Sequence, residues 1–239
     1  MTSITVTEKE SAGENLLYVQ SASSELFSHA DCSARVARTG GRVELKVNCP
    51  EFYSDLIKTE IADKVSEIIT IKYKIDYFKK NLKVGGLTPN EKEILYASLI
   101  AADLEDDKRY TFSKLKSYDS IAIDGVYNFC LRPLKKKWQD VVECIPQIFL
   151  SSQLKEFISY LLENKKRRVF IDEGRVYDSH YRRLNRSELL GGESVKIVRE
   201  VLLSNCGEVD ICGEIPKDDE YFLKEYYRDK IVFSNKFIN

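Results

Sequence analysis

The apolar residues of this chain change their period near Arg168, and this change constrains the fold more than any other feature. Before it, apolar residues recur at spacings of three and four between Ile123 and Leu162, which is typical of helices that bury one side. After it, Arg168 to Ile171 and Arg175 to Asp178 alternate around Asp172-Glu173-Gly174, which predicts a β-hairpin with a tight turn. The fold must therefore combine packed helices with a sheet.

The sequence predicts a small α+β unit that spans residues 1–50. Ser3 to Thr7 alternates and is β-branched, which favours a strand, and Glu14 to Phe27 has helical spacing. Two further β-prone runs, Cys32 to Arg38 and Val43 to Val47, flank Gly40-Gly41. Because glycine tolerates positive φ, this pattern predicts an antiparallel hairpin.

Residues 51–165 predict a helical region that forms a central bundle. Apolar residues between Glu51 and Leu82 recur every three or four positions and predict the longest helix of the chain. Lysines in its C-terminal half are expected to complement the helix dipole; they are Lys72, Lys74, Lys79, Lys80 and Lys83. Thr88-Pro89-Asn90-Glu91 then predicts a helix start with a capping box.

Residues 166–239 predict a C-terminal α/β region, which in an alternative division forms one domain with 51–165. Glu208 to Cys212, Asp218 to Tyr227 and Ile231 to Phe233 have strand, helix and strand patterns in that order. Such an order gives a parallel crossover if both strands extend the sheet of the preceding hairpin. The predicted class is therefore α+β and helix-rich, with a small N-terminal unit, a central helical bundle, and a C-terminal mixed sheet with crossover helices.

The composition of the chain gives little information about its function. The 239 residues carry a net charge of -1, from 37 basic and 38 acidic side chains, which gives no global attraction to nucleic acid or anionic membrane. No apolar run approaches the roughly 20 residues that a membrane span needs. We expect a cytoplasmic protein without a membrane span, whose six cysteines are reduced and mostly buried.

Residues for familiar catalytic chemistry are few. Only two histidines exist, His29 and His180, and no Cys/His nucleophilic pair is indicated by spacing. A zinc site built from His180, Cys206 and Cys212 would lack the short pair spacings of such sites. Gly191-Gly192 precedes a predicted helix whose amides could hold an anion, although a loop and cap explain it better. We expect no catalytic residues, no metal and no cofactor.

Three basic clusters are the candidate binding residues. They are Lys135, Lys136 and Lys137; Lys165, Lys166, Arg167 and Arg168; and His180, Arg182 and Arg183. The favoured interpretation is contact with an unknown protein partner. One alternative is nucleic-acid binding, for which such clusters and aromatic neighbours are suited. Another is a small-molecule enzyme whose pocket near His180 gathers the two arginines with perturbed acids such as Asp178 or Asp210.

Two runs carry a resemblance to a known family. They are Asp124-Gly125-Val126-Tyr127-Asn128-Phe129-Cys130-Leu131 and Leu154-Lys155-Glu156-Phe157-Ile158-Ser159-Tyr160-Leu161-Leu162. Their order resembles that of the YtxC-like putative sporulation proteins of endospore-forming bacteria, and the likeness extends over about residues 88–235. Val126, Cys130 and Leu134 stand where that family usually has an aromatic residue, Arg and Tyr. That family has no established reaction, so the resemblance implies a place in the sporulation programme and no particular chemistry. We expect an accessory or interaction protein that is not an enzyme, with the small-molecule enzyme kept as an alternative.

Overall fold

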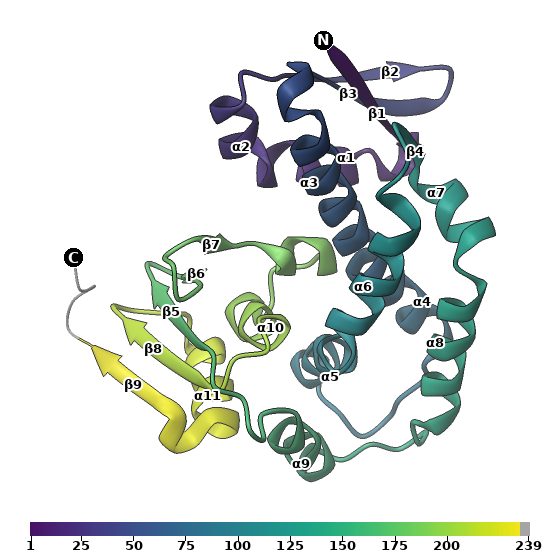
Figure 1. Cartoon of the computed structure of the whole chain (residues 1–239). Coiled ribbons are helices and arrows are strands. Elements are labelled where there is room, and N and C mark those ends of the chain that lie inside the picture. Colours follow the sequence, from purple (N-terminus) through teal and green to yellow (C-terminus); the bar gives the residue numbers. More distant parts are fainter. Residues whose placement is uncertain (235–239) are drawn as a thin grey trace. The chain divides into compact units, whose positions relative to one another are not determined.

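The computed structural model describes residues 1–234 and has the predicted helix-rich α+β class. The chain divides into two compact units (Figure 1). Unit 1 comprises Met1–Lys74 and Glu105–Asp140, and unit 2 comprises Ile75–Leu104 and the chain from Val141 onward. This grouping differs from the expected regions, because the segment 51–165 contributes helices to both units.

Unit 1 contains a four-stranded sheet in the order β2-β3-β1-β4. Its strands are β1 (Thr2–Lys9), β2 (Ser33–Thr39), β3 (Arg42–Cys49) and β4 (Ser120–Ala122). The hairpin of β2 and β3 is confirmed, and β1 pairs antiparallel with β3. On its other side β1 pairs parallel with β4, with Val6 opposite Ile121. Alternate side chains such as Val6 and Leu45 are fully buried, so one face of the sheet forms part of the core.

Unit 1 also contains helices, of which α1 and α7 contact the sheet directly. The helices of this unit are η1 (Glu10–Ala12), α1 (Glu14–Ala22), α2 (Ser24–His29), η2 (Glu51–Tyr53), α3 (Ser54–Glu67), η3 (Ile68–Tyr73), α6 (Leu104–Leu115), α7 (Ile123–Gly125), η4 (Val126–Cys130) and most of α8 (Arg132–Cys144). Helix α1 contacts the three strands β1, β2 and β3, and α3 packs on α1. The predicted long helix is present, but η3 interrupts it as a π-helix.

Unit 2 contains a five-stranded sheet in the order β7-β6-β5-β8-β9. Its strands are β5 (Arg168–Asp172), β6 (Arg175–Tyr177), β7 (Arg183–Leu184), β8 (Glu208–Cys212) and β9 (Ile231–Ser234). The hairpin of β5 and β6 is confirmed, and so is the parallel crossover from β8 to β9. Strand β8 also pairs parallel with β5, so the last two strands extend the hairpin sheet as predicted.

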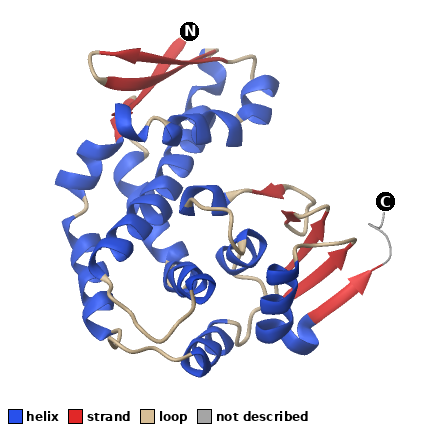
Figure 2. Cartoon of the chain, turned by 180° about the vertical axis from the view of Figure 1, so that it is seen from behind, coloured by secondary structure: helices blue, strands red, loops and turns tan. Residues whose placement is uncertain are grey.

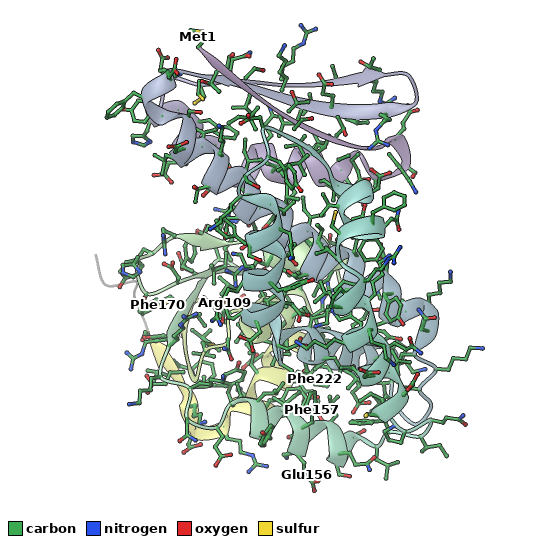
Figure 3. The ribbon with its side chains drawn as sticks, turned by 45° about the vertical axis from the view of Figure 1, so that its right-hand side comes forward. Met1, Arg109, Glu156, Phe157, Phe170 and Phe222 are labelled. Carbon is green, nitrogen blue, oxygen red and sulfur yellow. The ribbon has the colours of Figure 1, made fainter. Side chains whose placement is uncertain are left out.

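Helices cover one face of this second sheet (Figure 2). The helices of unit 2 are α4 (Lys74–Asn81, from Ile75), α5 (Pro89–Ala101), α9 (Ser151–Leu161), η5 (Arg186–Leu190), α10 (Lys196–Leu203), α11 (Lys217–Tyr227) and η6 (Arg228–Lys230). Helix α10 packs on α5 and α11, and α11 packs on α9. Phe222 belongs to α11 and Phe157 to α9 (Figure 3). The capping box at Thr88 and Glu91 is present as predicted.

Candidate functional site

Two π-helical segments of unit 1 meet through aromatic rings. Tyr73 ends η3 and Tyr127 lies in η4, and their ring centroids are 4.6 Å apart. Tyr127 also stacks on the ring of Trp138 from α8, at 6.0 Å. A π-helix widens the backbone turn and is rare, and it occurs frequently at functional sites. The pairing of two such segments therefore marks this part of unit 1 as the candidate site.

A buried carboxylate, Asp107 of α6, holds the surrounding elements together. Its two oxygens accept hydrogen bonds from Lys74 Nζ at 2.7 Å, Trp138 Nε1 at 2.9 Å and Lys137 Nζ at 2.6 Å. The side chains of Lys74 and Asp107 are 0% and 1% exposed. Burial alone would raise the pKa of Asp107, but Lys74 and the hydrogen bonds from Lys137 and Trp138 lower it below its ordinary value. Asp107 therefore remains ionised.

A second buried carboxylate, Glu8 of β1, holds the end of η3. Its Oε2 accepts a hydrogen bond from the Tyr73 hydroxyl at 2.7 Å and a longer one from Asn15 Nδ2 at 3.4 Å. Burial and the bond to Glu8 raise the pKa of Tyr73 well above its ordinary value. Tyr73 is thus a neutral hydrogen-bond donor, and its bond to Glu8 stabilises the end of η3.

The segment η4 is fixed at both ends and exposed in its middle. Before it, Asp124 Oδ1 lies 2.6 Å from Arg42 Nη2 of β3, and the pKa of Asp124 is lowered chiefly by this hydrogen bond. After it, Leu131 is fully buried. Between them the Phe129 side chain is 77% exposed, and Cys130 is exposed as well. The motif that carries the family resemblance therefore presents a large apolar side chain to solvent.

The three lysines predicted on α8 lie beside this segment, and each makes a contact within unit 1. Lys135 Nζ stands 4.3 Å from the centroid of the Tyr127 ring. Burial and the nearby Arg132 lower the pKa of Lys135. Lys136 pairs with Asp140 at 2.8 Å, and Lys137 bonds to Asp107. These lysines stabilise the candidate site, and their charge is partly neutralised.

The other predicted basic residues belong to unit 2. Lys165, Lys166, Arg167 and Arg168 lead into β5, while His180, Arg182 and Arg183 follow β6. Arg168 pairs with Glu208 at 2.6 Å, Arg182 with Asp178 at 2.7 Å and Arg183 with Glu188 at 3.5 Å. Carboxylates at these distances reduce the positive charge that attraction to phosphate would need.

Asp178, one of the acids named for the small-molecule alternative, organises a turn. It accepts hydrogen bonds from the backbone amides of His180 at 2.8 Å and Arg182 at 3.0 Å. Burial opposes these bonds, but together with the Arg182 side chain they lower the pKa of Asp178. A nearby pocket is lined by Arg183, whereas His180 and Arg182 are absent from its lining. Asp178 thus holds His180 and Arg182 in one turn, whereas Arg183 lines the pocket.

The anion position at the start of α10 is filled by the protein itself. Asp219 of α11 accepts the Val198 amide at 2.9 Å and also bonds to the Ile197 amide. The preceding glycines are held from the other side, because Arg199 donates to the carbonyls of Gly191 at 2.7 Å and Gly192 at 2.8 Å. This confirms the loop-and-cap interpretation of the glycine pair.

Several buried charged residues were not anticipated from the sequence. Lys74 is expected from the sequence only to complement the helix dipole, but its side chain is buried and pairs with Asp107 of another helix. Glu200 was placed on no site, although its position inside the apolar run from Ile197 to Leu203 was a usable signal. The cysteines are unpaired as expected, but Cys130 and Cys144 are exposed.

Among residues 1–234, no group of three or more His, Cys, Asp or Glu side chains is arranged to hold a metal ion. No described helix is both long enough and apolar enough to cross a membrane. Comparisons of the chain with protein-family models, with curated proteins and with solved structures find no match.

Proposed function

We propose that this chain is a cytoplasmic accessory protein that is not an enzyme and binds a protein partner through η4. The observation that carries the proposal is the exposure of Phe129, at 77%, in a segment that is otherwise anchored. An exposed aromatic side chain on a rigid support loses little conformational entropy on binding, which suits it as an interface anchor.

The support of η4 strengthens this proposal. The Asp124 ion pair, the stacked Tyr127 and the buried Leu131 fix the backbone on both sides of Phe129. A π-helical segment that served packing alone would be expected to bury its large apolar residues. We infer that the partner offers an apolar pocket for this ring.

The resemblance to YtxC-like proteins supports a sporulation-associated setting for the proposed function. Phe129 and Leu131 occupy positions that match the family pattern, whereas Cys130 replaces its usual Arg. The proposed partner therefore makes no use of an arginine at that position, and the aromatic ring carries the contact.

Site-specific crosslinking tests this proposal. Cys130 and Cys144 are both exposed, so a photoreactive maleimide can be attached to Cys130 in a Cys144→Ser background. The matched control carries the same probe at Cys144 in a Cys130→Ser background. Extracts of sporulating endospore-forming cells are then irradiated with each labelled protein.

The expected result is a discrete adduct from Cys130 that Phe129→Ser removes and Phe52→Ser leaves intact. Phe52 is a suitable control because it is 88% exposed and lies outside the motif. Equal adducts from Cys130 and Cys144, or an adduct insensitive to Phe129→Ser, would refute the proposal.

A further inference from the structure

Two cysteines of unit 1 face each other at the open end of the hairpin of β2 and β3. The register of the hairpin places Ser33 opposite Asn48, and one step further along both strands brings Cys32 opposite Cys49. A side-chain hydrogen bond joins the two thiols. Their sulfur atoms therefore lie next to each other in the folded chain.

The backbone geometry of this pair suits a disulfide bond. The Cys32 amide donates to the Phe27 carbonyl at 2.9 Å, so Cys32 and Cys49 do not exchange two backbone hydrogen bonds. In a cross-strand pair of this kind the Cα atoms are about 4.5 Å apart and the side chains approach closely. A disulfide joins Cα atoms that are about 4.4–6.8 Å apart, so the bond can form with little movement of the strands.

The two thiols differ in their access to solvent. Cys32 is half-buried, whereas Cys49 is 0% exposed and its Sγ lies 3.8 Å from the Thr2 carbonyl oxygen. A small disulfide in solution therefore reacts first with Cys32. Cys49 is then placed to attack the mixed disulfide, which is the role of a resolving cysteine.

The surroundings of Cys32 make this reaction slow near neutral pH. Burial raises the pKa of Cys32, and the neighbouring Cys49 and Asp31 raise it further. The thiolate is the nucleophile in thiol–disulfide exchange, so a raised pKa leaves little reactive Cys32. The pair is thus suited to a sustained change in the balance of thiols and disulfides.

We propose that Cys32 and Cys49 form a reversible disulfide that locks the hairpin of β2 and β3 when low-molecular-weight disulfides accumulate. The Cys32 thiolate attacks such a disulfide and releases one thiolate, and the Cys49 thiolate then attacks the Cys32 sulfur and releases the second. The two cysteines are oxidised, the small disulfide is reduced, and the two protons lost by the cysteines pass to the released thiolates.

The bond would fix the edge of the first sheet. Strand β2 is the outermost strand and pairs only with β3, whereas β3 also pairs with β1. A disulfide at the start of β2 therefore ties this edge strand to the interior of the sheet. The proposal concerns the hairpin alone and is independent of the proposed contact at Phe129.

A redox titration of the full chain tests the proposal. Cys130→Ser and Cys144→Ser are introduced first, because these two exposed thiols would also react with glutathione. The chain is equilibrated with mixtures of reduced and oxidised glutathione, quenched with acid, digested and analysed by mass spectrometry. The expected product is a pair of peptides linked through Cys32 and Cys49. Its equilibrium constant should be about 100-fold greater in the folded than in the urea-unfolded chain, as the closure of a short loop predicts.

A matched variant moves one thiol to the opposite face of the strand. Cys32→Ser combined with Ser33→Cys keeps the number of cysteines, but a shift of one residue turns the thiol away from Cys49. This variant is expected to form a mixed disulfide with glutathione and no internal bond. Circular dichroism shows whether it is folded.

Three results would overturn the proposal. The folded chain would carry only glutathione adducts at Cys32, or the folded and unfolded chains would have equal equilibrium constants, or the shifted thiol would link to Cys49 as readily as Cys32 does. Should the shifted variant not fold, the comparison of the folded and unfolded chains decides the test.

Discussion

Replacing Asp107 by Asn is expected to destabilise unit 1 more than any surface substitution. The change removes the carboxylate charge that pairs with Lys74 while keeping the side-chain volume. Lys74 is 0% exposed and cannot reach water without local unfolding. Breaking a buried ion pair by removing one partner costs about 3–5 kcal/mol, a large part of a typical folding free energy of about 5–15 kcal/mol.

The chain supplies its own probe for this measurement. Trp138 is the single tryptophan of the sequence, and its indole donates to Asp107. Urea unfolding followed by tryptophan fluorescence therefore reports on the site itself. Circular dichroism recorded in parallel follows the helices of both units.

Two control variants separate charge burial from other effects. Asp106→Asn removes an exposed carboxylate from the same helix, at 73% exposure, and is expected to cost about 0–1 kcal/mol. Lys74→Met combined with Asp107→Asn removes both buried charges and is expected to be more stable than Asp107→Asn alone. The reasoning is refuted if Asp107→Asn unfolds like Asp106→Asn, or if the double variant is the least stable.

The same ion pair predicts a pH dependence. Because the pKa of Asp107 is lower in the folded than in the unfolded state, its stabilisation is present above the unfolded pKa of about 3.9. It is lost as the pH falls through the lower folded value. In Asp107→Asn, the free energy of unfolding should therefore fall less steeply as the pH is lowered, as measured by Trp138 fluorescence. An acid unfolding curve with the same pH dependence as the wild type would contradict the lowered pKa of Asp107.

Three further substitutions test other features. Thr88→Ala removes the N-cap hydroxyl of α5 and should cost about 1 kcal/mol in urea unfolding, with no change if the cap is unimportant. The pKa of Glu200 is raised in the folded state, so its contribution to folding stability is full below the unfolded pKa of about 4.3 and is lost as the pH rises through the folded pKa. In Glu200→Gln, thermal unfolding should therefore show a smaller change of stability with pH over this range. At Gly207 a Cβ would lie 2.1 Å from the Lys165 carbonyl oxygen, so Gly207→Ala should cost about 1–3 kcal/mol or more, whereas Gly85→Ala, with a nearest contact of 3.7 Å, should cost much less.

Local signals predicted the elements that depend on nearby residues. The capping box at Thr88, the glycine turn between β2 and β3 and the hairpin of β5 and β6 each follow from residues a few positions apart. The parallel placement of β8 and β9 followed from the helix between them, since a crossover of that length joins parallel strands. The class of the fold was therefore accessible from the sequence.

Features set by distant residues were not accessible. Strand β4 has three residues, and its pairing with β1 depends on a segment more than 100 positions earlier, so no local pattern identifies it. The π-helical turn of η4 has the same apolar spacing as an ordinary helix over five residues. The basic clusters were visible as charge runs, but the carboxylates that pair with Lys137, Arg168 and Arg183 come from other elements of the fold.

The division of unit 1 into two chain segments has a consequence during synthesis on the ribosome. Strand β1 is among the first parts to be made, but β4 and Asp107 emerge only after the unit 2 segment from Ile75 to Leu104. A nascent chain that ends before Glu105 therefore contains Lys74 but not Asp107, and it contains β1 but not the strand β4 that pairs with it. The edge of β1 can then pair with another chain, so slow translation across this region is expected to favour aggregation over folding.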